Sequence, residues 1–268
     1  MVRRLRCGAL AAVLAGAPWA AGTAQAPGGP GAVTPNAAAQ GRRPDLRPGE
    51  GLAVSGPDGE VHGFGASRAD APLGALARLV WLKFEGAEWA ARDVVFKCKG
   101  PCAGTKGHGR VDLEAAYRLG CQQALRAWIA ASAEGWRRDY GEGVARTRLE
   151  EAFRPFLGDR MPKGEGIPAL DPGWVGEGGL LRASPEAFLA WLNDPGQADL
   201  LSRCQRMLGS RAYHFKDLVG AEDWWILSDG AGVVGSNGQV IAVLHLPEPR
   251  PLPEAVRRFQ SLMGAPLK

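Results

Sequence analysis

The stretch Ala71-Pro72-Leu73-Gly74-Ala75-Leu76-Ala77-Arg78-Leu79 decides how the fold of this 268-residue chain is interpreted. Apolar residues follow Pro72 almost without interruption, and this pattern predicts an apolar helix from Pro72 to Glu85. The identity of two residues matters as much as the pattern, because position 75 is an alanine and position 78 an arginine. Neither offers reactive chemistry, since alanine has no heteroatom and an arginine guanidinium stays protonated at accessible pH.

The composition is that of a globular protein. Apolar residues make up 46% and charged residues 22% of the chain, which predicts a buried core for one large domain or two closely packed lobes. The formal net charge is +4, and it falls to about +1 (4 − 3) without the three arginines of the first six residues. A nearly neutral chain gives no support to nucleic-acid binding, and we expect no such partner.

The N-terminus has the pattern of a secretory signal peptide. Arginines within residues 3–6 precede a short apolar run over residues 8–17, and small residues at 24–26 offer a cleavage site. No later segment approaches about 20 uninterrupted apolar residues, the length that crosses a bilayer. We therefore expect residues 1–26 to be removed and the mature protein to be periplasmic or secreted, without a membrane span.

The rest of the chain divides into a linker and one domain. Residues 27–49 are rich in proline, glycine and alanine, which predicts a flexible linker. Residues 50–268 begin with a predicted hairpin, Leu52–Phe64, and carry a second one near the end around Ser236-Asn237-Gly238. A final helix is predicted over Pro253–Met263.

Residues from about 97 to 208 are predicted as a mainly helical lobe. Asp112 is expected to cap a helix that runs to about Ala133, and Ser184, followed by Pro185, is expected to cap another. Strands at both ends of the domain should join in one antiparallel sheet. The predicted fold class is therefore α+β: an antiparallel sheet flanked by terminal helices, with an inserted all-helical lobe.

The cysteines allow two interpretations. The mature chain has four, namely Cys98, Cys102, Cys121 and Cys204. In an oxidising compartment an even number favours disulfides, and three pairings are open. A zinc site is the alternative because His108 is near, but the Cys98-to-Cys102 spacing is wider than the usual knuckle and has no second close pair. We expect disulfides, no metal and no cofactor.

Several segments, in the correct order, resemble the penicillin-recognising transpeptidase and class D β-lactamase superfamily. Residues 71–79 are similar to the start of the nucleophile helix, where the family carries Ser-x-x-Lys. Residues 109–116 resemble the segment that leads into the second motif, Ser-x-Asn. Residues 176–185 and 208–212 resemble the segments before a core helix and before the third motif.

At the positions of the first two family motifs, this chain lacks the residues that carry out the reaction. Acyl transfer in the family needs a serine oxygen to form the covalent intermediate, and Ala75 stands at that position. Arg78 stands in place of the lysine base, and no Ser-x-x-Lys occurs elsewhere in the chain. The second motif would fall at Gly120-Cys121-Gln122, where Gly120 cannot relay a proton and Gln122 keeps an amide that can bind.

The third motif is degenerate as well. Lys-Thr-Gly would fall at Ser228-Asp229-Gly230, so the neutral Ser228 replaces the cation and the anionic Asp229 replaces the threonine. Both changes weaken attraction for a substrate carboxylate. The resemblance thus implies an exported pseudoenzyme that binds a peptidoglycan stem peptide or an envelope protein. No catalytic residue is intact, and the positions expected to line its cleft are Ala75, Arg78, Gly120, Gln122, Ser228, Asp229 and Gly230.

Two other hypotheses stay open. The first is an active enzyme on the same fold, either a transpeptidase or carboxypeptidase or a β-lactamase-like hydrolase. It would use Ser67 or Ser228 as the nucleophile, with Arg78 as an electrostatic group. The second is an unrelated secreted α+β domain with a structural or interaction role.

Overall fold

The computed structural model describes residues 44–90, 95–102, 106–161, 163, 174, 176, 179–208 and 224–264. The chain divides into two units, Met1–Thr34 and Pro35–Lys268, and every described residue belongs to the second. The signal peptide, most of the linker and the segment 209–212 lie outside the described residues, so these assignments stay predictions. Of the helices formed by the described residues, none has the length and apolar character needed to cross a bilayer.

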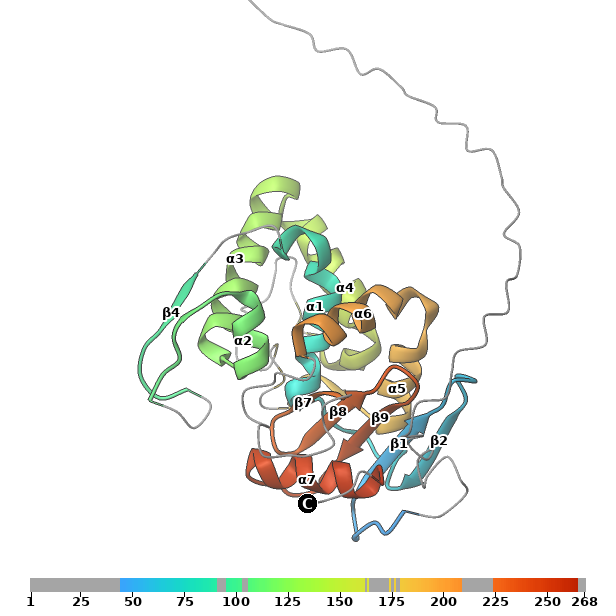
Figure 1. Ribbon diagram of the computed structural model, residues 1–268. Coiled ribbons are helices and arrows are strands. Elements are labelled where there is room, and N and C mark those ends of the chain that lie inside the picture. Colours follow the sequence, from blue (N-terminus) through green and yellow to red (C-terminus); the bar gives the residue numbers. More distant parts are fainter. Residues whose placement is uncertain are drawn as a thin grey trace, which may run out of the picture. The chain divides into compact units, whose positions relative to one another are not determined.

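A five-stranded antiparallel sheet joins the two ends of the described chain, in the order β2-β1-β9-β8-β7 (Figure 1). Its strands are β1 (Gly51–Ser55), β2 (Val61–Gly65), β7 (Trp225–Ser228), β8 (Gly232–Ser236) and β9 (Ile241–His245). The N-terminal hairpin meets the C-terminal strands through β1 and β9, with Ala53 opposite Val243. Asn237 closes the β8–β9 turn by accepting hydrogen bonds from the backbone N–H groups of Gln239 (3.0 Å) and Val240 (2.8 Å). The single sheet built from two terminal hairpins is therefore confirmed.

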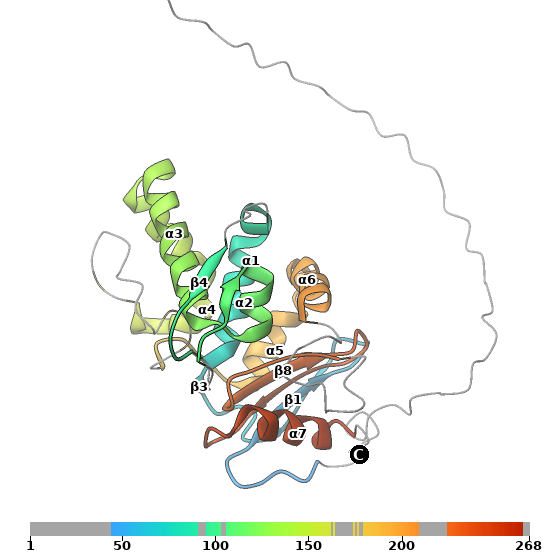
Figure 2. The same ribbon diagram turned by 60° about the vertical axis from the view of Figure 1, so that its left-hand side comes forward.

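Helices cover both faces of this sheet. They are α1 (Ala77–Ala90), α2 (Leu113–Leu119), α3 (Gln122–Tyr140), α4 (Glu142–Leu157), α5 (Pro185–Asn193), α6 (Ala198–Leu208) and α7 (Leu252–Leu262). Figure 2 shows α7 on one face and the other helices on the opposite side. The strand period of two explains this: Leu52 and Leu244 pack with Phe259 of α7, whereas Ala53 and Val243 face the core shared with the helical lobe. The α+β fold class is confirmed.

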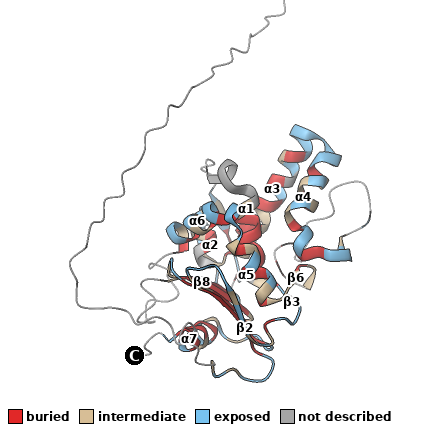
Figure 3. Ribbon diagram, turned by 90° about the vertical axis from the view of Figure 1, so that its right-hand side faces the viewer, coloured by how far each residue is buried: buried red, intermediate tan, exposed pale blue. Residues whose placement is uncertain are grey.

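Burial follows the same arrangement. Every residue of β1, β7 and β8 is buried, whereas the edge strand β2 is exposed or partly exposed along its length (Figure 3). Short pieces complete the described fold: the strand pairs β3 (Ala71–Pro72) with β6 (Arg182–Ala183) and β4 (Phe96–Cys98) with β5 (Gly109–Val111), and the 3-10 turns η1 (Gly74–Leu76), η2 (Gly158–Arg160) and η5 (Pro195–Gln197). The candidate site described below thus lies against buried central strands.

The first predicted helix begins later than expected. Pro72 pairs with Arg182 in the β3–β6 ladder, and Gly74 adopts a left-handed φ of 53°. Because of this turn, the regular helix α1 starts at Ala77, not at Pro72.

The predicted helix from Asp112 to Ala133 is wrong in one respect, because it is two helices. Asp112 does cap α2, accepting a hydrogen bond from the N–H of Ala115 at 2.7 Å. The helix then ends at Gly120, whose φ of 62° is left-handed. The N–H groups of Gly120 and Cys121 donate to the carbonyls of Tyr117 and Ala116, which is a Schellman ending. The α3 helix starts afresh after Cys121.

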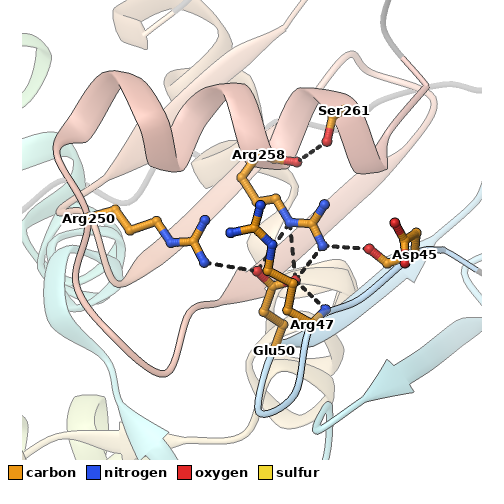
Figure 4. A network of polar contacts seen from close by, with 6 residues as sticks. All are labelled: Asp45, Arg47, Glu50, Arg250, Arg258 and Ser261. Atoms are coloured by element: carbon orange, nitrogen blue, oxygen red, sulfur yellow. Dashed lines mark hydrogen bonds and ion pairs between the residues drawn. The ribbon is translucent and has the colours of Figure 1, made fainter.

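A buried carboxylate ties the start of β1 to α7 (Figure 4). The side chain of Glu50 is fully buried, and Arg258 Nε lies 3.1 Å from each of its oxygens. Arg250 Nη2 lies 3.4 Å from Oε1, and the Arg47 N–H donates to Oε2 at 2.9 Å. Burial alone would raise the pKa of Glu50, but these hydrogen bonds and the two guanidinium charges hold it below its ordinary value.

Candidate functional site

The segment with the missing nucleophile lies beside the β7–β8 turn. The backbone of Ala75 forms the middle of η1, and η1 packs against β7 and β8. A Cβ atom at Gly232, the first residue of β8, would lie 3.4 Å from Leu76 Cγ and 3.5 Å from the Leu73 carbonyl oxygen. The turn η1, which leads into α1, therefore packs against the sheet next to the residues predicted as the third motif.

Arg78 turns its charged group toward the second-motif position. Its side chain is buried, with 6% of the residue exposed, and its backbone carbonyl accepts a hydrogen bond from the Tyr117 hydroxyl at 3.1 Å. A Cβ atom at Gly120 would lie 3.2 Å from Arg78 Nη1. The guanidinium therefore fills the space beside Gly120, where a serine side chain would have to fit.

Asp229 turns its carboxylate toward the first-motif position. Oδ1 accepts hydrogen bonds from the N–H groups of Ala231 (3.0 Å) and Gly232 (2.9 Å), which close the β7–β8 turn. The other oxygen, Oδ2, lies so close to Gly74 that a Cβ atom there would be 1.9 Å away. A negative charge therefore lies against the residue that precedes Ala75.

The charge of Asp229 also reaches His245 at the end of β9. Burial lowers the pKa of His245, the charge of Asp229 raises it, the charge of Arg182 lowers it, and the net direction is downward. This imidazole therefore stays neutral to lower pH than usual.

The remaining predicted positions have structural contacts. Ser228 is buried, and its Oγ accepts a hydrogen bond from the Gly230 N–H at 3.1 Å. A Cβ atom at Gly230 would lie 2.2 Å from the Arg250 carbonyl oxygen, which explains why glycine is needed there. Gln122 is partly exposed at the first position of α3, and the contacts described for it do not include the other predicted positions.

Two hollows in the described surface lie near the sheet, and neither is centred on these residues. One beside η1, lined by Leu73, Leu76 and Gly232 among others, has a volume of only about 10 Å³, room for no more than a water molecule. A larger one of about 570 Å³ lies at the other end of the strands, with Trp225 on its sheet side and Gln205 of α6 opposite. Sequence reasoning missed this groove, because its lining residues come from five separate short segments and carry no motif.

The prediction of disulfides is wrong for the described cysteines. Cys102 Sγ and Cys121 Sγ lie 3.9 Å apart, almost twice the S–S bond length of about 2.05 Å. Cys204 is buried on α6 outside the group formed by the other three, and burial raises the pKa of its thiol to about 12. Among the described cysteines, therefore, no disulfide is formed.

Two of the clustered thiols, Cys98 and Cys121, differ in the direction in which their pKa is shifted. Burial raises the pKa of Cys121 to about 12. Burial also acts to raise the pKa of Cys98, but hydrogen bonds from the His108 N–H and from the Cys121 and Cys102 thiols bring it below its ordinary value.

No family model and no curated protein matches the sequence. Solved structures are similar to it in three dimensions. A class D beta-lactamase from Bacillus subtilis is 14% identical over 82% of this chain and 93% of its own, with a TM-score of 0.48. The OXA-427 class D beta-lactamase is 14% identical over 81% and 96%, with a TM-score of 0.49. A beta-lactamase from Burkholderia phymatum is 14% identical over 80% and 92%, with a TM-score of 0.44.

The chain's own topology carries the fold assignment. One five-stranded antiparallel sheet joins the two ends of the described chain, with the last described helix on one face and a helical lobe on the other, as the order of strands and helices predicted. In architecture, the chain resembles the β-lactamase and transpeptidase superfamily.

Proposed function

We propose that this chain is an exported, non-catalytic binding protein of the cell envelope, built on a β-lactamase-like and transpeptidase-like scaffold. The observation that carries the proposal is the composition of the site around η1. The nucleophile position is Ala75, Arg78 fills the space beside Gly120, and the Asp229 carboxylate lies against Gly74.

These three features oppose acyl transfer on physical grounds. Without an oxygen or sulfur atom at position 75, no covalent acyl intermediate can form there. A guanidinium cannot accept the proton that activates a nucleophile. The Asp229 carboxylate places negative charge beside Gly74, next to the nucleophile position, and this charge would repel the negative charge that a tetrahedral intermediate develops.

The displaced-serine alternative gains no support from the described contacts. Ser67 is only 4% exposed, and its hydroxyl donates to Glu186 Oε1 at 2.7 Å. This hydrogen bond and the nearby Arg68 lower the pKa of Glu186, and a carboxylate that is more acidic than usual is a weak general base. Ser228 is also buried, as described above.

Turnover measurements separate a binding protein from an enzyme. The purified mature chain and its Ser67→Ala and Ser228→Ala variants are assayed for hydrolysis of a chromogenic cephalosporin and for D-alanine release from a stem pentapeptide. We expect no turnover from any of the three. Turnover by the wild type that disappears in either variant would contradict the proposal and identify the nucleophile.

The ligand is tested separately, with a stem pentapeptide ending in D-Ala-D-Ala and tryptophan fluorescence as the readout. If the peptide binds at the motif positions, Gln122→Ala removes one hydrogen-bonding amide. Affinity should then fall about threefold to tenfold, the usual worth of one such bond. Gln205→Ala, in the groove at the other end of the sheet, is the matched control and should bind normally.

The two variants also locate the ligand. A loss of binding confined to Gln205→Ala would move the binding site to the 570 Å³ groove. No binding by the wild type would remove the stem peptide as the ligand and favour an envelope protein as the partner.

A further inference from the structure

Four side chains from three separate segments converge beside the helical lobe. Cys98 ends β4, Cys102 lies in the loop after it, His108 directly precedes β5, and Cys121 is the N-cap of α3. One potential ligand atom from each lies within 4.8 Å of all the others, and the three cysteines are buried. We propose that these four residues form a tetrahedral Cys3His site that binds a zinc ion.

The measured separations are those of a tetrahedron around zinc. With Zn–S bonds of about 2.3 Å and a Zn–N bond of about 2.05 Å, tetrahedral angles place two sulfurs about 3.8 Å apart and a sulfur and a nitrogen about 3.6 Å apart. Cys102 Sγ and Cys121 Sγ are 3.9 Å apart, and Cys98 Sγ and His108 Nδ1 are 3.6 Å apart. Both separations fit shared coordination of one ion, and the sulfur pair does not fit a disulfide.

The described residues of the loop between Cys98 and His108 lie close to one another and are bonded to α3. Gly107 has a left-handed φ of 117°, and a Cβ atom there would lie 2.9 Å from the Gly100 carbonyl oxygen and 3.2 Å from that of Cys98. Gln123 of α3 donates hydrogen bonds to the carbonyls of Lys99 (3.1 Å) and Pro101 (3.3 Å). The loop is thereby fastened to the helix that begins at the fourth ligand.

The surrounding charge suits such a complex. Three thiolates and a neutral imidazole around Zn²⁺ carry a net charge of −1. The charged residues nearest in sequence to Cys98, Cys102 and His108 are all positive, namely Lys97, Lys99, Lys106 and Arg110. The N-terminus of α3, a helix without acidic residues in its first turn, adds a partial positive charge at Cys121.

The ligand set also favours zinc, and a structural role for it. Thiolate-rich tetrahedral sites select zinc over oxygen-preferring cations such as magnesium and calcium. Four protein ligands leave no open position for substrate, which is the mark of a structural site. The ion would fasten the β4–β5 hairpin to the start of α3, and it would let reduced cysteines persist in an exported protein.

Metal content tests the proposal directly. The mature chain is purified with zinc present, and zinc is measured per chain in the wild type and in Cys98→Ala, Cys121→Ala and Cys204→Ala. We expect about one zinc per chain for the wild type and for Cys204→Ala, and less than about a tenth of that for the two ligand variants. Cys204→Ala is the matched control because it also removes a buried thiol, but outside the cluster.

Three further measurements on the wild type cover the case in which the ligand variants fail to fold. Cobalt substitution should give the absorption of a tetrahedral thiolate complex, and a chelator should lower the melting temperature. The mass of the denatured, unreduced chain reports any disulfide as a loss of two hydrogens. Absence of bound zinc together with that loss, or a melting temperature unaffected by the chelator, would overturn the proposal.

Discussion

Replacing Glu50 by glutamine removes the charge at the centre of the network in Figure 4 and keeps the shape of the side chain. The Glu50 side chain has no exposed surface, whereas those of Arg258 and Arg250 are 13% and 24% exposed. Removing one partner of a buried ion pair costs about 3–5 kcal/mol, because the other charge is left uncompensated. Both arginines keep some contact with water, so we expect the lower end, about 3 kcal/mol.

The effect must depend on pH in a defined direction. The folded-state pKa of Glu50 is lowered, so the carboxylate contributes stability above its ordinary pKa and loses it as pH falls through the folded value. Glutamine does not titrate. The difference in stability between the wild type and Glu50→Gln should therefore be largest near neutral pH and shrink in acid, below about pH 4.

Thermal unfolding followed by circular dichroism measures this. For a chain of this size, about 3 kcal/mol corresponds to a fall in melting temperature of roughly 6–12 °C. Arg68→Ala is the control, because it breaks an ion pair with Glu186 in which the arginine is 88% exposed, and it should cost less than about 1 kcal/mol. A Glu50→Gln protein that melts with the wild type at pH 7, or a difference that persists unchanged in acid, would refute the reasoning.

Three other changes test the site and the caps. Gly120→Ser should destabilise the fold by about 1–2 kcal/mol in urea, because position 120 is left-handed and a Cβ there meets Arg78; an unchanged midpoint would contradict this. Asp229→Asn should lower the pKa of His245 further, since the aspartate charge raises it, and an NMR titration in which that pKa rises would show the contact is misassigned. Ser184→Ala should cost about 1 kcal/mol by removing the hydrogen bond to the Ala187 N–H (3.2 Å), and no loss would mean that this cap is not formed in solution.

Features that depend on neighbouring residues were predictable from the sequence. The turn at Asn237 and the caps at Asp112 and Ser184 follow from side chains that bond to backbone within three residues, and all are present. The pairing of β1 with β9 also followed, because two unpaired hairpins must each find a partner for an edge strand.

Features set by backbone geometry or by distant contacts were not predictable in the same way. Apolar periodicity continues through Gly120, so the pattern gave no sign of its left-handed turn. That turn brings Cys121 next to Cys102, which lies 19 residues earlier in the sequence. The usual spacings of metal-binding cysteines therefore did not predict the cluster. Likewise, nothing in the motif positions indicated that Arg78 would fill the space beside Gly120 or that Asp229 would lie against Gly74.

The central claim is that a β-lactamase-like scaffold here carries no acylating nucleophile. The most direct test is the intact mass of the purified wild-type chain after incubation with a large excess of a reactive penicillin. We predict a mass unchanged from that of the untreated protein, because Ala75 has no atom to acylate. A covalent penicilloyl adduct, localised by peptide mapping to any serine of the chain, would contradict the account.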